Sequence, residues 1–278
     1  MKKIDIHIHT DEHSIQIGDK RIPSVDELAN DIYVDLKVDK GVIMTTIDNN
    51  CSDPETLEKL CEEANQKSYE LATKYPDLLD WFCYIDPRIG SNSAETDFSP
   101  YLEKYKKMGA KGLGEIFANI YFDDPRVENL LSYCEKYDMP ILFHLSPSVG
   151  GPYGIVDDLG LPRLEKMLKK FPNLKFIGHS QLFWSEISSD VTEEIRNDYP
   201  TGPVIPGRIV ELLRKYPNLY ADLSANSGYT AISRDPDFGY SFLEEFQDRL
   251  MYGTDYLIPR GGINLTKFLD DAVAKGHI

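Results

Sequence analysis

Residues 4–9 read IDIHIH, a strict alternation of apolar and polar side chains. Successive side chains of a β-strand point to opposite faces, so the three isoleucines share one face while Asp5, His7 and His9 share the other. The stretch therefore predicts a strand that packs its isoleucines against helices and directs two imidazole rings into the same space.

Seven further β-rich runs follow this one, each separated from the next by an amphipathic helical stretch. The eight predicted strands are centred near Ile6, Ile43, Cys83, Leu113, Leu142, Phe176, Ala221 and Met251. Regular alternation of strand and helix indicates a parallel sheet. Eight such units without a linker predict a (β/α)8 TIM barrel that forms a single domain over residues 1–278. A doubly wound open sheet is the alternative, but the sequence lacks the GxGxxG turn that such sheets usually carry.

Several helix boundaries carry their own signals. Ser24 and Glu27 have the spacing of a capping box, and Asp53 precedes a proline at the first position of a predicted helix. Gly41 and Gly276 stand where a residue with positive φ would end a helix.

The composition excludes several classes of function. The chain has 278 residues, of which 41% are hydrophobic, and its 46 acidic against 30 basic residues give a net charge of −16. This charge repels nucleic-acid phosphates and anionic lipids, so neither nucleic acid nor a membrane is an expected partner. The sequence has no apolar run of signal-peptide or membrane-span length, and its four cysteines form no CxxC pair. We therefore expect a cytoplasmic protein with reduced thiols that acts on a small molecule, while formation of a homodimer stays open.

The carboxyl ends of the predicted strands carry four of the six histidines and two acids. These residues are His7, His9, Glu115, His144, His179 and Asp255. Because the carboxyl ends of parallel strands meet at one face of a barrel, the six side chains are expected to converge. Neutral imidazole nitrogens and carboxylate oxygens are suitable ligands for a borderline cation such as Zn²⁺. The pattern predicts a divalent metal site.

A metal in such a site would support hydrolysis. It lowers the pKa of bound water from 15.7 to about 7 and polarises a substrate carbonyl. A carboxylate beside that water accepts its proton and transfers it to the leaving group, and Asp255 is the candidate for this role. Glu115 has an alternative role, which is to orient a ligating histidine or to pair with a lysine.

Other residues near the predicted mouth of the barrel are candidates for contact with substrate. Arg88 and Arg234 are candidates to bind a substrate carboxylate, with a solvated turn arginine as the alternative. Phe183 and Trp184 follow the sixth strand, where they form either a pocket wall or ordinary packing. Asp222 is expected to make buried hydrogen bonds, with orientation of a ligand as the alternative.

Five motifs spread over the predicted strands: IDIHIH at residues 4–9, GEI at 114–116, FH at 143–144, IGH at 177–179 and YGTD at 252–255. Together they resemble the amidohydrolase superfamily, specifically its amidohydrolase-related branch (amidohydrolase 2). The resemblance implies a distorted (β/α)8 barrel with one or two divalent metals, most often zinc. It also implies hydrolysis of amide, lactone or ester bonds.

The resemblance assigns roles to the candidate ligands. His7, His9 and Asp255 would hold the more buried metal, and His144 and His179 would hold a second one. In single-metal members His144 completes the first site, and the histidine at the position of His179 contacts the substrate instead.

The number of metals bears on the reaction. Glu115 stands where many members carry a carboxylated lysine, and a glutamate there can bridge two metals. The leading hypothesis is a hydrolase in which Asp255 transfers the proton and His179, with the metal, stabilises the oxyanion. The alternative is a non-oxidative decarboxylase of the aminocarboxymuconate-semialdehyde decarboxylase type, whose sites resemble single-metal sites. A metal-dependent DNase also opens with HxH, but the net charge of −16 is a poor match for DNA.

Overall fold

Eight parallel strands form the centre of the molecule. The computed structural model describes residues 3–17, 20–47, 51, 53–257 and 262–278. The eight strands are β1 (Ile4–Ile8), β4 (Lys40–Met44), β5 (Leu79–Phe82), β6 (Leu113–Ile116), β7 (Ile141–Ser146), β9 (Phe176–His179), β10 (Leu219–Asp222) and β11 (Leu250–Met251). Three short strands are added to them: β2 (Ile15–Ile17), β3 (Lys20–Ile22) and β8 (Ile155–Val156).

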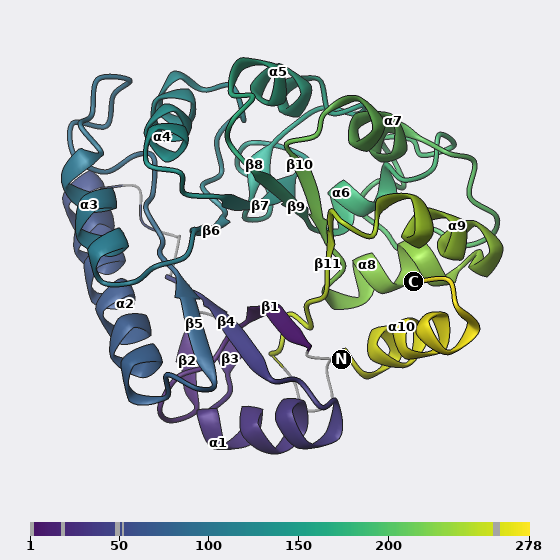
Figure 1. The fold of residues 1–278 in the computed structure, drawn as a ribbon. Helices are drawn as coiled ribbons and strands as arrows, with labels where there is room; N and C mark the ends of the chain where they lie inside the picture. Colours follow the sequence, from purple (N-terminus) through teal and green to yellow (C-terminus); the bar gives the residue numbers. More distant parts are fainter. Residues whose placement is uncertain (1–2, 18–19, 48–50, 52, 258–261) are drawn as a thin grey trace.

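The eight strands follow one another around a ring (Figure 1). One sheet has the order β1-β4-β5 and the other the order β6-β7-β9-β10-β11, with every neighbouring pair parallel. One parallel bridge crosses each seam between the two sheets, joining Cys83 to Leu113 and Ile8 to Tyr256. The predicted barrel architecture is confirmed, although ladder pairing at the two seams is reduced to these bridges among the described residues.

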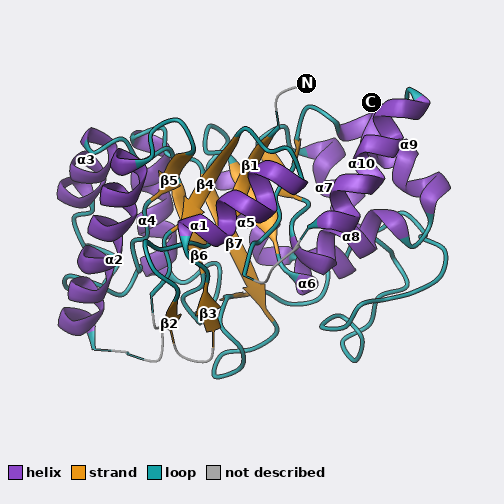
Figure 2. Cartoon of the chain, turned by 90° about the horizontal axis from the view of Figure 1, so that it is seen from below, coloured by secondary structure: helices purple, strands orange, loops and turns teal. Residues whose placement is uncertain are grey.

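Helices surround the strands on the outside of the ring (Figures 1 and 2). They are α1 (Val25–Leu28), the π-helix η1 (Ala29–Asp35), α2 (Pro54–Lys74), α3 (Ser99–Lys107), α4 (Pro125–Lys136), α5 (Pro162–Lys170), α6 (Gln181–Ser185), α7 (Arg208–Lys215), α8 (Ala225–Ser233), α9 (Pro236–Phe246) and α10 (Ile263–Lys275).

The local signals for helix ends are correct with one exception. Ser24 and Glu27 form the predicted capping box, and the Asp53 side chain accepts a hydrogen bond from Thr56 N at the start of α2. Gly276 ends α10 with a φ of 79°. Gly41 lies inside β4 instead, where an added Cβ would stand 2.5 Å from Ile8 Cδ1. Close packing against β1, rather than a helix end, accounts for a glycine at this position.

The alternation predicted for β1 is broken by an irregular register between Asp5 and Ile8. Ile6 packs against the apolar cluster inside the ring, whereas Ile8 belongs to the outer core between strands and helices. The prediction that Asp5 shares a face with the two histidines is therefore wrong. Its carboxylate instead accepts hydrogen bonds from Thr254 Oγ1 at 2.6 Å and from the backbone N of His7 at 3.0 Å.

The cysteines agree with the prediction of reduced thiols. All four cysteines are free thiols, and Cys61, Cys83 and Cys134 are buried. In the described ranges, no helix combines the length and apolar character needed to cross a membrane.

Candidate metal centre

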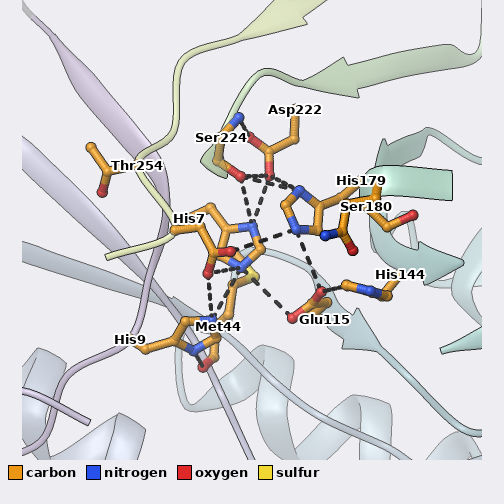
Figure 3. A network of polar contacts seen from close by, with 12 residues as sticks. His7, His9, Met44, Glu115, His144, His179, Ser180, Asp222, Ser224 and Thr254 are labelled. Atoms are coloured by element: carbon orange, nitrogen blue, oxygen red, sulfur yellow. Dashed lines mark hydrogen bonds and ion pairs between the residues drawn. The ribbon is translucent and has the colours of Figure 1, made fainter. Parts of the chain in front are cut away.

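The six predicted strand-end side chains converge at the carboxyl ends of the strands, as the sequence led us to expect. Figure 3 labels five of them: His7, His9, Glu115, His144 and His179. Their nitrogen and oxygen atoms, with those of Asp255, fall into two neighbouring groups of three.

The first group consists of His7, His9 and Asp255. The Nε2 atoms of the two histidines lie 3.2 Å apart. Asp255 Oδ1 lies 3.2 Å from His9 Nε2 and 3.6 Å from His7 Nε2. Three potential ligand atoms thus surround one small space.

The second group consists of Glu115, His144 and His179. Glu115 Oε1 lies 2.5 Å from His144 Nδ1 and 3.7 Å from His179 Nε2. The other carboxylate oxygen of Glu115, Oε2, lies 3.7 Å from His7 Nε2 in the first group. Glu115 therefore presents one oxygen to each group.

Asp222, at the end of β10, bonds to one histidine of each group. Its Oδ2 lies 2.7 Å from His7 Nδ1 and 3.2 Å from His179 Nδ1, and it accepts a hydrogen bond from Ser224 Oγ at 2.7 Å. These contacts occupy the Nδ1 side of both rings and leave each Nε2 directed at the six-residue cluster (Figure 3). Asp222 accordingly orients ligand atoms, which is the alternative that the sequence left open for it.

His9 is oriented by a different pair of groups. Its Nδ1 lies 2.9 Å from Thr46 Oγ1 and 3.2 Å from the carbonyl oxygen of Met44. Its Nε2 is thereby turned toward the first group.

The carboxylates of the cluster favour positive charge beside them. Burial alone would raise the pKa of Glu115, yet His144 and His7 hold it well below its usual range. Burial would likewise raise the pKa of Asp255, which His7 lowers. Burial would lower the pKa of His7, but the carboxylates of Asp255 and Asp222 raise it to about 10. Buried carboxylates thus force a proton onto His7, which is the response expected where positive charge is needed.

The donor set fits a divalent cation. Imidazole nitrogens and carboxylate oxygens are the ligand types that zinc and similar metals prefer, and carboxylate support of ligating imidazoles is usual at such sites. A third group of close ligand atoms, made by His7, His179 and Asp222, uses the Nδ1 atoms that already bond to the carboxylate. The first and second groups are therefore the candidate ligand sets.

An aromatic side chain that the sequence did not single out packs on the second group. The Tyr153 ring centroid lies 4.5 Å from that of His144. The Asn119 amide holds this loop by donating to the carbonyl oxygens of Ser148 at 3.1 Å and Pro152 at 2.9 Å. Only the position of Tyr153 in the loop after the fifth strand of the barrel could have indicated it.

The four predicted substrate residues make other contacts. Both Nε and Nη2 of Arg88 donate to the carboxylate of Asp86 at 2.8 Å. The two nitrogens that could bind a substrate carboxylate side by side are therefore already bonded. Arg234 lines a hollow beside the segment that follows α6, and its Nε and Nη2 are buried with no hydrogen-bond partner among the described residues. Burial lowers the pKa of Arg234.

The prediction of a pocket wall at Phe183 and Trp184 is corrected by their burial. Phe183 is fully buried, and a Cβ on Gly178 would stand 2.1 Å from its ring. Trp184 is 2% exposed, and its Nε1 donates to the carbonyl oxygen of Asp222 at 2.8 Å. Both rings pack α6 onto the strands, which is the role that aromatic residues beside a parallel sheet usually take.

The barrel and the histidine and carboxylate cluster define the class of a candidate metal-dependent barrel enzyme. The family model described as amidohydrolase matches residues 4–277. The chain therefore belongs to the amidohydrolase family, and the predicted resemblance is confirmed. At the level of this family, the prediction of an amidohydrolase-type enzyme is also confirmed. No curated protein matches the sequence.

Solved structures with a similar fold include enzymes that are named for different reactions. A probable 2-pyrone-4,6-dicarboxylic acid hydrolase from Acinetobacter baumannii is 15% identical, with a TM-score of 0.58 over 100% of this chain and 96% of that one. A 2,6-dihydroxybenzoate decarboxylase from Rhizobium is 15% identical, with a TM-score of 0.58 over 97% and 92%. A dihydroxybenzoic acid decarboxylase from Polaromonas sp. JS666, solved with bound manganese, is 16% identical, with a TM-score of 0.59 over 97% and 90%. At these identities the likeness establishes the fold and leaves the reaction open.

Proposed function

We propose that this protein is a metal-dependent hydrolase that cleaves an amide, lactone or ester bond of a small molecule. The observation that carries the proposal is the orientation of Glu115. Its Oε2 faces His7 at 3.7 Å, while its Oε1 faces His144 at 2.5 Å and His179 at 3.7 Å. A carboxylate placed in this way is suited to bridge two cations, which the family resemblance associates with hydrolysis.

The proposed ligand sets follow the two groups. His7, His9 and Asp255 hold one cation, His144 and His179 hold the other, and Glu115 serves both. A divalent cation in such a site supplies Lewis acidity, which polarises a carbonyl oxygen and makes water more acidic. Zinc is the metal we propose, and manganese is the second metal to test because one structure of similar fold contains it.

Asp255 and His179 take the proposed catalytic roles. Desolvation would raise the pKa of Asp255, but His7 holds it below the usual range, so Asp255 is a carboxylate at neutral pH. Its side chain is 21% exposed, more than the His7 or His179 side chains. Asp255 accepts a proton from the attacking water and passes it to the leaving group. When only one cation is bound, His179 Nε2 contacts the substrate oxygen.

A decarboxylase is the second candidate function. Several of the structures of similar fold bear the names of decarboxylases, either of a dihydroxybenzoate or of 5-carboxyvanillate. A one-cation form, in which His179 contacts a substrate carboxylate, would suit that reaction.

The broader setting of the proposal comes from the sequence. The net charge of −16 supports a small molecule as the partner over nucleic acid or a membrane surface, and a cytoplasmic location is part of the proposal. A single domain over residues 1–278 is part of the proposal, and the mass of the native protein in solution would establish whether it forms a homodimer.

Metal content and product identity test the proposal together. Protein purified without chelator or affinity metal is analysed by plasma mass spectrometry, beside the double variant His7→Ala/His9→Ala. The variant His13→Ala/His277→Ala is a matched control, because both of its histidines lie outside the cluster. We expect two cations per chain in the native protein and the control, loss of both in the first variant, and hydrolysis of members of a lactone, ester and amide panel.

The other outcomes of the experiment are distinct. One cation per chain, with carbon dioxide released from a 2-hydroxybenzoate and no hydrolysis, would favour the decarboxylase. Absence of stoichiometric metal after addition of zinc or manganese would overturn the metal centre itself.

A further inference from the structure

A cavity of about 290 Å³ lies beside the first group of the metal centre. It is partly open and is lined by the residues that follow β1, the end of β4, the β2–β3 hairpin and one face of α2. Figure 2 shows the hairpin next to α2 at one end of the barrel. Most of its wall is apolar, including Ile22, Ile43, Met44, Ile47 and Leu71. Polar side chains, among them Thr46 and Ser68, make up the rest of the wall, and the apolar part can hold an apolar group of a ligand.

The cavity and the metal centre share His9. The Nε2 of this ring faces His7 and Asp255, while its Nδ1 bonds to Thr46 Oγ1 and the Met44 carbonyl oxygen. Both Thr46 and Met44 also line the cavity. The imidazole ring of His9 thus borders both the cavity and the atoms proposed to hold a cation.

The charges around the cavity limit what it can bind. Among the described residues, its lining includes the acids Asp11 and Glu63 and one lysine, Lys67. Glu63 and Lys67 are exposed, so they stand at the rim rather than in the apolar interior. Two carboxylates against one ammonium group disfavour an anionic guest.

We infer that this cavity binds an uncharged alkyl or aryl substituent of the substrate while the reacting carbonyl lies at the metal centre. The inference rests on the proposed hydrolase function and specifies its substrate class, which is an ester, lactone or amide with an apolar arm. The volume is at the low end for ligand sites, so it suits one substituent rather than a whole large ligand.

A chain-length series tests the inference through turnover. We expect kcat/KM for 4-nitrophenyl esters to rise from acetate to hexanoate by about two- to fourfold per methylene, as burial of each CH₂ predicts. In Ala64→Phe the new ring occupies the cavity from α2, so the ratio of hexanoate to acetate activity falls at least tenfold. Ala72→Phe is the matched control, because Ala72 is also a half-buried alanine of α2 but does not line the cavity. If Ala64→Phe does not fold, Leu60→Ala enlarges the cavity and moves the optimum to a longer ester.

Ligand-observed NMR with hexan-1-ol and hexanoate separates this inference from the proposed function. We expect the native protein to bind the alcohol in preference to the anion, and Ala64→Phe to lose that binding. Binding of the alcohol without hydrolysis of any ester would leave the cavity assignment standing and overturn the hydrolase. Hydrolysis that is independent of chain length, or preference for hexanoate over the alcohol, would overturn the inference and leave the hydrolase standing.

Discussion

The two groups of the candidate metal centre are anchored to the barrel in different ways. The first group joins the beginning and the end of the barrel, because His7 lies on β1 and His9 directly after it, whereas Asp255 follows β11. The backbone N of Asp255 donates to the carbonyl oxygen of His7 at 2.9 Å. This contact lies at a seam where the strand ladder is reduced to the bridge between Ile8 and Tyr256.

The second group belongs to one continuous sheet. Glu115, His144 and His179 lie on β6, β7 and β9, and His144 stands directly opposite His179 in the parallel register. The side chain of His144 is 13% exposed, against 0% for His7. Its position depends on side-chain contacts with Glu115 and Tyr153.

Because of this difference, substitutions in the two groups are expected to have different effects. The first group requires closure of the whole ring and contains the carboxylate proposed to transfer the proton, so damage to it is expected to reduce turnover most. The second group is built within one sheet, so damage to it is expected to change the number of cations while the first site persists. Substitutions in each group can therefore strengthen or break the comparison.

Asp255→Asn is expected to have the largest effect on turnover. The amide keeps the shape of the side chain but cannot accept the proton, so kcat falls about 10²- to 10⁴-fold. Cation content stays near the native value because the histidines remain. Measurement of kcat and of metal per chain checks both statements. Asp270→Asn, which alters an exposed partner of Lys3, serves as the control. Native turnover in Asp255→Asn would remove this carboxylate from the chemistry.

Glu115→Gln is expected to separate the two groups. Loss of the shared charge reduces the metal content from two cations to one, and kcat falls about 10²-fold as one source of charge stabilisation is removed. Plasma mass spectrometry and kcat on the same preparation check this. A variant that still binds two cations would show that the second group does not depend on a bridging carboxylate.

Asp222→Asn acts on both groups at once. Since Asp222 contacts His7 at 2.7 Å and His179 at 3.2 Å, its loss is expected to weaken both cation sites by about 10- to 100-fold. Titration with Co²⁺, whose absorption spectrum reports coordination, gives the two dissociation constants. Asp157→Asn is the matched control, because Asp157 is an equally buried carboxylate that bonds to the backbone at the start of α5. A change confined to one site would contradict the shared role.

The dependence of cation affinity on pH tests the first group alone. The pKa of His7 is raised to about 10, so without a cation its ring carries a proton at pH 7 to 9. A cation must displace that proton, and the affinity is therefore expected to rise about tenfold per pH unit over this range and to level off above pH 10. An unperturbed histidine, with a pKa near 6.5, would give a flat profile there. Calorimetry in two buffers of different protonation enthalpy counts the protons released.

Much of the fold and the centre of the site could be predicted from the sequence. Strand and helix periodicity is a local property, and the ends of parallel strands necessarily meet, so convergence of His7, Glu115 and His179 followed from placing each at a strand end. The direction of Asp5 could not be predicted, because the irregular register of β1 depends on its pairing with β4. The alternation of side chains ceases to hold at such a point.

The surroundings of the site were harder to predict for a different reason. Aromatic residues after a strand have the same local signature whether they face a pocket or the core, and Phe183 and Trp184 proved to be core. The contact between Tyr153 and His144 depends on a loop that Asn119 holds through backbone carbonyl groups. No local pattern encodes that arrangement, since it joins segments about thirty residues apart.

Replacement of Tyr153 is expected to have the smallest effect and to fall on the second group alone. An aromatic pair contributes about 0.5–1.5 kcal/mol, so Tyr153→Ala should weaken the second cation about two- to tenfold and leave the first unchanged. Tyr153→Phe keeps the ring beside His144 and should restore the native affinity, as Co²⁺ titration of both variants would measure. An equal loss at both sites would mean that the loop supports the whole centre, and failure of phenylalanine to restore binding would assign the effect to the hydroxyl. Either result would remove the ring contact as the reason that His144 is held in place, and with it part of the distinction between the two groups.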